Sequence, residues 1–183
     1  MKALFLKFLE APGRDTYLAV RNALIASKHY MPYSKEMDGV REFIDKGKYE
    51  EVKMILHASM RNLLLSPRAH SLLAYVNRKL NDLDGADREQ AMALACCKGI
   101  LATGDGTEAN PFAVVRISDE YDLIEHLGRR FMSQEIVRRG KQYLDRVTCA
   151  DDTVFWFDIT DAYSQLQRVY ADDLLDTLAD DDF

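Results

Sequence analysis

Apolar side chains recur at helical spacing through residues 14–102, and this periodicity constrains the fold more than any other feature of the sequence. Tyr17, Val20 and Leu24 begin the pattern. The Met31-Pro32 pair interrupts it, because proline disfavours a helical residue before it. The later stripes are Val40, Phe43 and Ile44; Val52, Ile55, Leu56 and Leu63; Ala69, Leu72, Leu73, Val76 and Leu80; and Ala91, Leu94 and Ala95. The first half of the chain is therefore predicted to be helical.

Turn-forming residues separate these helices and predict how they pair. Ser34 is expected to cap the helix that Gly47 ends, and the polar turn 81–85 separates the last two helices. The stretch GKYEEVKMIL, followed by SPRAHSLLAYVNRKLNDLDGADREQAMALA, resembles the tetratricopeptide pattern, with Ala74 as a small residue where the next helix must pack closely. The alternative is a generic antiparallel helix pair.

Beyond Leu101 the sequence changes from helical to strand character. PFAVVRIS (111–118) and TVFWFDIT (153–160) are rich in β-branched and aromatic residues and are predicted strands, with QYLDRVT (142–148) a third. Between them, DEYDLIEHLG predicts a short helix that Ser118 or Asp119 caps and Gly128 ends. The loop Gly104-Asp105-Gly106 is where the helical part becomes the sheet.

These elements predict an α+β fold that is mostly α, with tetratricopeptide-like antiparallel helical hairpins followed by a small antiparallel β-sheet and a C-terminal helix. Residues 1–183 are expected to form a single compact domain. Its parts are a helical hairpin half at 14–102, a small β-sheet half with a short helix at 103–160, and an acidic C-terminal helix and tail at 161–183. The last stripe, which either folds back on the sheet or binds a partner, is Tyr163, Leu166, Tyr170, Leu174 and Leu178.

Composition excludes several classes of function. Apolar residues make up 48 % of the chain, which is enough to bury a core, and the formal net charge is -6. The tail carries much of that charge, as Asp172, Asp173, Asp176, Asp180, Asp181 and Asp182. The rest of the chain is about neutral, so no nucleic-acid partner is expected. No run approaches the roughly 18 apolar residues of a membrane span, so no membrane partner is expected either.

The N-terminus and the cysteines favour a cytoplasmic protein. Lys2 and Lys7 break the apolar stretch that a secretory signal requires, so the first ten residues are interpreted as an ordered strand or the start of a helix. Cys96, Cys97 and Cys149 make neither a disulfide framework nor a C-x-x-C motif. Reduced thiols in a cytoplasm fit this pattern best.

The sheet-side motifs resemble a bacterial family catalogued as domain of unknown function four-nine-one-nine. The matching residues are Gly104, Asp105 and Gly106; Glu120, Tyr121, Asp122 and Leu123; and Phe155, Phe157, Asp158 and Ile159. The resemblance covers roughly residues 34–160 and implies tetratricopeptide-like helices, a G-D-G loop, an E-Y-D segment and a closing aromatic strand. Many members of the family begin with an export signal, which we do not expect here, and the acidic helix after Asp158 is outside the family pattern.

Candidate chemistry is confined to the G-D-G loop and the acidic cluster after it. The loop lacks the spacing of a dinucleotide loop and the lysine of a phosphate loop, so we interpret it as a helix C-cap, with calcium as the functional alternative. Asp122 and His126 stand four residues apart and could share a metal or a proton, with Tyr121 donating beside them. An ordinary helical ion pair is the structural alternative. We therefore expect no cofactor and no metal.

Two classes of function remain open. The first is a non-enzymatic module whose helices bind a protein or peptide partner. The second is an enzyme or small-molecule binder with a polar site between the halves, built from Asp105, Tyr121, Asp122 and His126. An aromatic and basic groove across the helices would favour the first, whereas a closed pocket holding those four groups would favour the second.

Overall fold

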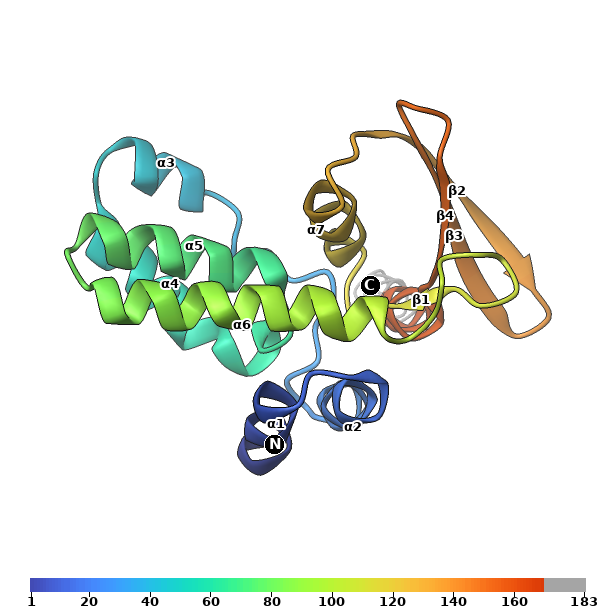
Figure 1. The fold of residues 1–183 in the computed structure, drawn as a ribbon, viewed down its shortest axis with the longest axis horizontal. Helices are drawn as coiled ribbons and strands as arrows, with labels where there is room; N and C mark the ends of the chain where they lie inside the picture. Colours follow the sequence, from blue (N-terminus) through green and yellow to red (C-terminus); the bar gives the residue numbers. More distant parts are fainter. Residues whose placement is uncertain (170–183) are drawn as a thin grey trace, which may run out of the picture.

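The computed structural model describes residues 1–169 and confirms the predicted α+β, mostly α class. The elements follow in this order: α1 Lys2–Glu10, α2 Arg14–Ile25, α3 Val40–Asp45, α4 Tyr49–Leu63, α5 Pro67–Lys79, α6 Leu83–Leu101, β1 Phe112–Ala113, α7 Ser118–His126, β2 Phe131–Arg139, β3 Gln142–Cys149 and β4 Val154–Asp158, with residues 160–169 helical after them. Helices α3 to α6 lie at one end of the molecule and the sheet at the other, with α7 between them (Figure 1). The long helix α6 reaches from the hairpins toward the sheet.

Helices α4 and α5 form where the apolar stripes predict them. The Ser66 side chain caps α5 by accepting a hydrogen bond from the Ala69 amide at 3.3 Å, and Pro67 occupies the first turn, where its missing N–H costs nothing. Their facing stripes bury an aliphatic cluster with α3. This α3–α5 cluster consists of Val40, Val52, Leu56, Leu63, Ala69, Leu73 and Val76.

Two details of the helical part differ from the prediction. Ser34 caps no helix: α3 begins only at Val40, after Gly39 with φ 76°, and the Ser34 hydroxyl donates to Glu36. In α6 the predicted face is correct only for Ala95, because Ala91 and Leu94 are exposed. The buried face contains Ala93, Cys96, Cys97 and Ile100. A helix rich in alanine and cysteine has no sharp apolar stripe, so its spacing alone does not determine which face is covered.

The sheet is mixed, not purely antiparallel. Its strand order is β1-β4-β3-β2, and β1 pairs in parallel with β4 while the other neighbours are antiparallel. The chain reaches β4 only after α7, β2 and β3, which lets two strands distant in sequence run in the same direction. Strand β2 was not predicted, because eight of its nine residues are exposed and it has no alternating apolar pattern.

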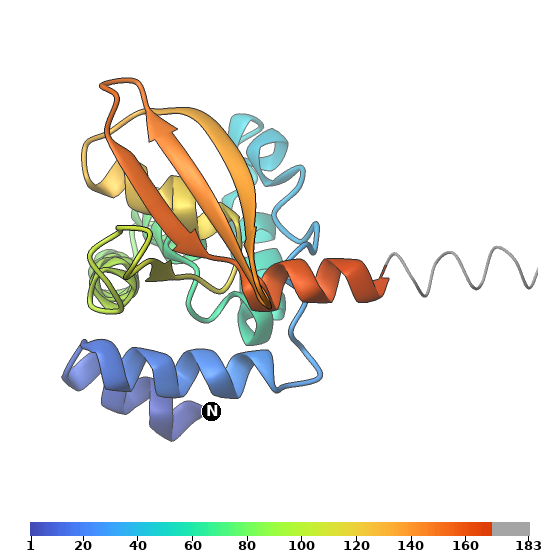
Figure 2. The same ribbon diagram turned by 90° about the vertical axis from the view of Figure 1, so that its right-hand side faces the viewer.

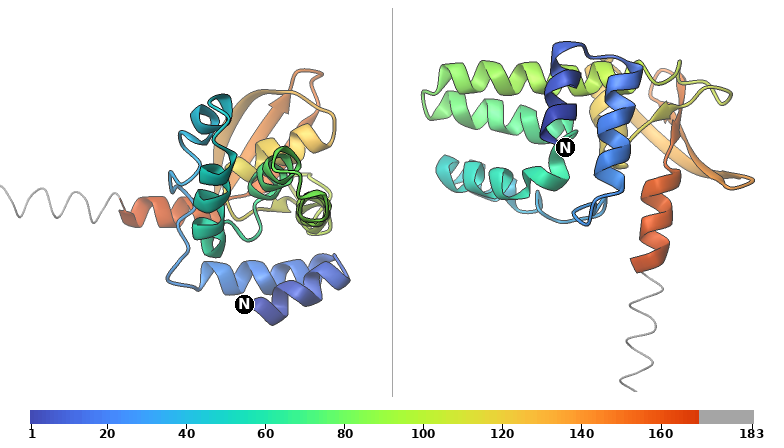
Figure 3. Two further views of the ribbon diagram at one scale, coloured as in Figure 1. Left: turned by 90° about the vertical axis from the view of Figure 1, so that its left-hand side faces the viewer. Right: turned by 90° about the horizontal axis from the view of Figure 1, so that it is seen from below.

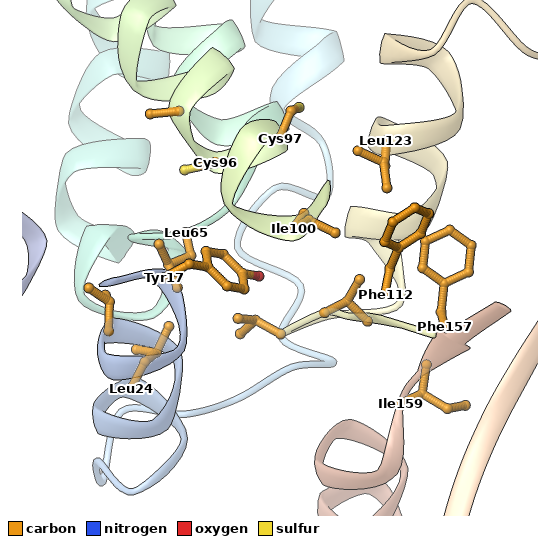
Figure 4. Packing of buried hydrophobic residues seen from close by; sticks show 14 of the residues in the cluster. Tyr17, Leu24, Leu65, Cys96, Cys97, Ile100, Phe112, Leu123, Phe157 and Ile159 are labelled. Carbon is orange, nitrogen blue, oxygen red and sulfur yellow. The ribbon is translucent and has the colours of Figure 1, made fainter. Parts of the chain in front are cut away.

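A second cluster, the central cluster, joins the two ends of the molecule. It brings α1 and α2 against α6, α7 and the sheet, with Phe8, Tyr17, Ile100, Leu123 and Phe157 all fully buried (Figure 4). The first ten residues are therefore a helix and part of the core. The predicted face of β4 is correct in that Phe157 and Ile159 point inward.

The helix at residues 160–169 begins against the body and then leaves it. The ring of Tyr163 lies 4.4 Å from that of Tyr143, and Arg21 forms a 2.9 Å ion pair with Asp161. From there the helix projects away from the sheet (Figures 2 and 3), so these residues do not cover it. Tyr170, Leu174 and Leu178, and the predicted helix end near them, lie outside the described residues.

Candidate functional site

The Gly104-Asp105-Gly106 loop is a turn shortly after α6, but it is not the predicted helix C-cap, because that position is Ala102. The Asp105 carboxylate accepts hydrogen bonds from the backbone amide and the hydroxyl of Thr107, and these bonds lower the pKa of Asp105. Gly106 has φ +75°, and its carbonyl accepts a 2.9 Å bond from the Trp156 amide, which ties the turn to β4. Asp105 itself is exposed. The loop therefore has a structural role in joining helix to sheet.

Tyr121 lies apart from Asp105, between α7 and β2. Its ring packs edge-on against Phe131 with centroids 4.9 Å apart, and its hydroxyl donates to the Gln134 side chain. Gln134 in turn donates to Asp145 at 3.1 Å. Tyr121 therefore belongs to a polar chain that runs into the sheet.

Asp122 and His126 both line a hollow between α5, α6 and α7, which we call the polar hollow. Its volume is about 250 Å³, and Arg68, Cys97 and Glu125 also line it. The Arg68 guanidinium binds Asp122 at 2.7 and 2.8 Å and the Arg68 amide donates to it at 3.1 Å. This partner occupies the carboxylate that a metal or substrate would need. Of the four predicted groups, only Asp122 and His126 share a cavity.

The described residues assemble no metal site, and their cysteines are buried. Across residues 1–169, no three His, Cys, Asp or Glu side chains are placed so that they could hold a metal ion. The three cysteines are buried and free, and burial raises the pKa of Cys97 to about 12. A thiol with so high a pKa is a poor nucleophile at neutral pH.

Asp119 is fully buried at the start of α7. One carboxylate oxygen accepts from the amides of Val115 and Arg116, at 3.2 and 3.0 Å, and so fixes the turn before the helix. The predicted N-cap of α7, Ser118 or Asp119, is wrong, because Ile117 occupies that position. Desolvation raises the pKa of Asp119 to about 7.

Glu120 and Asp145 form a buried acid pair between α7 and β3. Both side chains are fully buried, and desolvation raises the pKa of Glu120 well above its usual range, with the Asp145 charge raising it further. Two carboxylates can only accept hydrogen bonds, so they satisfy one another only when a proton lies between them. The sequence marked Glu120 as a first-turn acid at a helix start and gave no sign that the sheet covers it.

A second hollow, larger than the polar hollow, is a groove between α3, α5 and the start of α7. Its volume is about 710 Å³. We call it the α3 groove and define it by Pro32, Tyr33, Ser34, Lys35, Met37, Asp38, Val40, Arg41, Ile44, Arg68, Leu72, Arg116, Ile117 and Ser118. Apolar side chains from three separate elements meet there, and the segment that follows α2 forms one wall.

Charge in the α3 groove is mainly positive. Lys35, Arg41, Arg68 and Arg116 line it against one carboxylate, Asp38. Arg68 is paired with Asp122 and Arg116 lies 3.8 Å from Glu36, so Lys35 and Arg41 supply the positive charge of the rim. Lys35 and Arg41 are exposed, whereas Arg116 is 3 % exposed and is held by the Pro32 carbonyl and the Ser34 hydroxyl, both at 3.3 Å. Its Nε atom is buried without a hydrogen-bond partner. The N-terminus of α7 lies at the same wall and adds the positive end of a helix dipole.

Comparisons with known proteins leave the site to be interpreted from its own chemistry. No family model, no curated protein and no solved structure matches the chain. Within residues 1–169 no helix combines the length and the apolar character needed to cross a bilayer.

In the sequence, the only sign of the α3 groove is the break at Met31-Pro32, because its other residues come from three distant segments.

Proposed function

We propose that this protein is a non-enzymatic peptide-binding module and that the α3 groove is its binding site. The observation that carries the proposal is a groove of about 710 Å³ with an apolar floor and a basic rim, set across the helices. Such a groove suits a segment that inserts apolar side chains and places carboxylates beside them. The partner we propose is therefore an acidic, leucine-bearing peptide segment.

The floor and the rim would contribute differently to binding. Val40 and Leu72 belong to the α3–α5 cluster or pack against it, so the floor is fixed before any ligand arrives. A preformed apolar floor keeps the entropic cost of binding low. The exposed Lys35 and Arg41 would attract the carboxylates and select against a basic peptide.

The wider classification and the cellular location belong to the same proposal. We propose tetratricopeptide-like hairpins on the basis of the consecutive helices α4, α5 and α6, with Pro67 at a helix start and Ala74 buried. Three free, buried cysteines support a cytoplasmic location. The enzyme alternative has no comparable support, because its four groups do not meet in one site. Asp105 lies in an exposed turn, Tyr121 packs against β2, and only Asp122 and His126 share the polar hollow.

Fluorescence anisotropy with two synthetic peptides tests the proposed function. Both carry the same leucines at helical spacing, one with aspartates and one with lysines at the remaining positions. We expect the full chain to bind the aspartate peptide at least about tenfold more tightly than the lysine peptide, because only the first complements the rim. Equal affinities would contradict the proposal.

Charge-reversal variants locate the site. Lys35→Glu combined with Arg41→Glu should abolish binding of the aspartate peptide. Lys98→Glu combined with Lys141→Glu changes the net charge equally at exposed positions outside the α3 groove and should leave binding nearly unchanged. If both pairs weaken binding to the same extent, the attraction is unspecific and the groove is not the site.

A further inference from the structure

We propose that the chain carries its own ligand for the α3 groove, the acidic segment 170–183, which docks there within the same molecule and competes with outside peptides. This inference rests on the proposed function of the groove.

The chemistry of the segment complements the groove. YADDLLDTLADDDF contains six aspartates and no lysine or arginine. Between the aspartates it carries Leu174, Leu175 and Leu178. Leucines matched to an apolar floor and aspartates matched to a basic rim are the features that the groove selects.

The start of the C-terminal helix lies close to the wall of the α3 groove. Arg21 donates to the Val114 carbonyl at 3.0 Å and to Asp161 at 2.9 Å, so the start of the C-terminal helix and the end of β1 share one side chain. Two residues after Val114 the chain reaches Arg116, in the wall of the groove. Helix 160–169 also leaves the body on the side where residues 26–39 run (Figures 2 and 3).

The segment is long enough to return. From Asp161 to Val169 the helix advances about 12 Å at the usual rise per residue. Residues 170–183 could span about 46 Å if extended, at about 3.3 Å per residue. The three leucines lie five to nine residues beyond Val169, a reach of about 17 to 30 Å if extended. This reach exceeds the advance of the helix, which makes docking within one molecule feasible.

Docking within one molecule would weaken the binding of an outside peptide. A tethered ligand acts at a high effective concentration, so even a weak segment can occupy the groove for most of the time. The apparent affinity for a competitor equals its intrinsic affinity multiplied by the fraction of molecules whose groove is free. A partner would then need to exceed the segment in affinity before it could bind.

Anisotropy with a labelled synthetic peptide of sequence YADDLLDTLADDDF tests this inference on the full chain. One variant replaces the tail leucines with serine, as Leu174→Ser, Leu175→Ser and Leu178→Ser, and a matched control replaces the same residues with methionine. We expect the serine variant to bind the labelled peptide about tenfold more tightly than the wild type, because its groove is free. The methionine control should bind as weakly as the wild type.

The outcomes separate this inference from the proposed function. If the wild type and the serine variant bind the labelled peptide equally, the segment does not dock. If the serine variant binds the designed aspartate peptide but not the labelled one, the α3 groove binds acidic peptides as proposed, but segment 170–183 is not its ligand. If the wild type affinity depends on chain concentration and sedimentation shows dimers, the segment docks on a second copy and the intramolecular inference is overturned.

Discussion

The α3–α5 helices and the region where α7 meets the sheet bury different kinds of side chain. The α3–α5 cluster is entirely aliphatic, and beside it lies the apolar α3 groove. The α7 region buries the three carboxyl groups of Asp119, Glu120 and Asp145. The helical region therefore has an apolar core and an accessible groove, whereas the α7 region is closed, and its stability is expected to depend on protonation.

The buried acid pair and the α3 groove are separate features of the molecule. Buried acids with raised pKa values are often taken to mark an active site. Here the Glu120–Asp145 pair has no lining position in the groove or in the polar hollow. We infer that these acids shape the stability of the fold and that the groove carries the function.

The largest expected effect is a core truncation in the helical region. Leu56→Ala should lower the free energy of unfolding by about 2–5 kcal/mol, because Leu56 is fully buried and a cavity would remain. The loss should be equal at pH 5 and pH 8, since the α3–α5 cluster has no titrating group. Urea melts check this, with Met54→Ala on the exposed face of α4 as a nearly neutral control. A strongly pH-dependent loss would show that the α3–α5 cluster is coupled to a titrating group.

Two glycines with positive φ should respond differently to alanine. Gly106→Ala should cost about 2–4 kcal/mol, because the new Cβ would lie 2.5 Å from the Phe112 ring and the φ of +75° strains any L-residue. Gly47→Ala should cost only about 1–2 kcal/mol, because nothing lies within 4 Å and only the φ of +69° is unfavourable. Equal denaturant midpoints for the two variants would show that the junction loop is an ordinary turn.

The acid pair should respond to removal of its charge. Glu120→Gln should raise the free energy of unfolding at pH 8 by about 1–3 kcal/mol, because the amide can donate to Asp145 without an ionisation cost. Glu125→Gln, which is exposed on the same helix, should change little. Thermal melts from pH 4 to pH 8 measure both variants, and a destabilised Glu120→Gln at pH 8 would contradict the shared-proton interpretation.

The direction of the wild-type pH dependence follows from the same groups. An acid whose folded-state pKa is raised favours the folded state while it is protonated, so its contribution is complete below the unfolded-state pKa and is lost as pH rises. For Asp119 the loss runs from about 3.8 to about 7. Glu120 acts in the same direction. Stability should therefore decline between about pH 4 and pH 7, and Glu120→Gln should flatten the decline.

The smallest expected effect concerns the exposed turn. Asp105→Ala should lower the melting temperature by only about 1–3 °C, because it removes two hydrogen bonds to Thr107 at a solvated site. A chelator should leave the melts of the wild type and of Asp105→Ala unchanged. A chelator-induced drop of many degrees in the wild type alone would establish a metal site at this loop.

The sequence predicted the helical region well and the sheet region less well, and the reason is physical. Leu56 and Leu73 sit on stripes that one neighbouring helix covers, so periodicity identifies them. Strand β2 is exposed along almost its whole length and carries no such pattern. Burial of Glu120 depends on β3, which follows more than twenty residues later, and residues from three distant segments form the α3 groove. Such non-local contacts leave little trace in local spacing.

A titration of the full chain with the aspartate peptide, followed by two-dimensional amide NMR, tests the central claim most directly. We expect the largest shifts at groove positions such as Tyr33, Val40 and Leu72, with His126 and Gln134 unaffected. Shifts centred on His126 in the polar hollow, or on Gln134 beside the acid pair, would contradict the assignment of binding to the α3 groove.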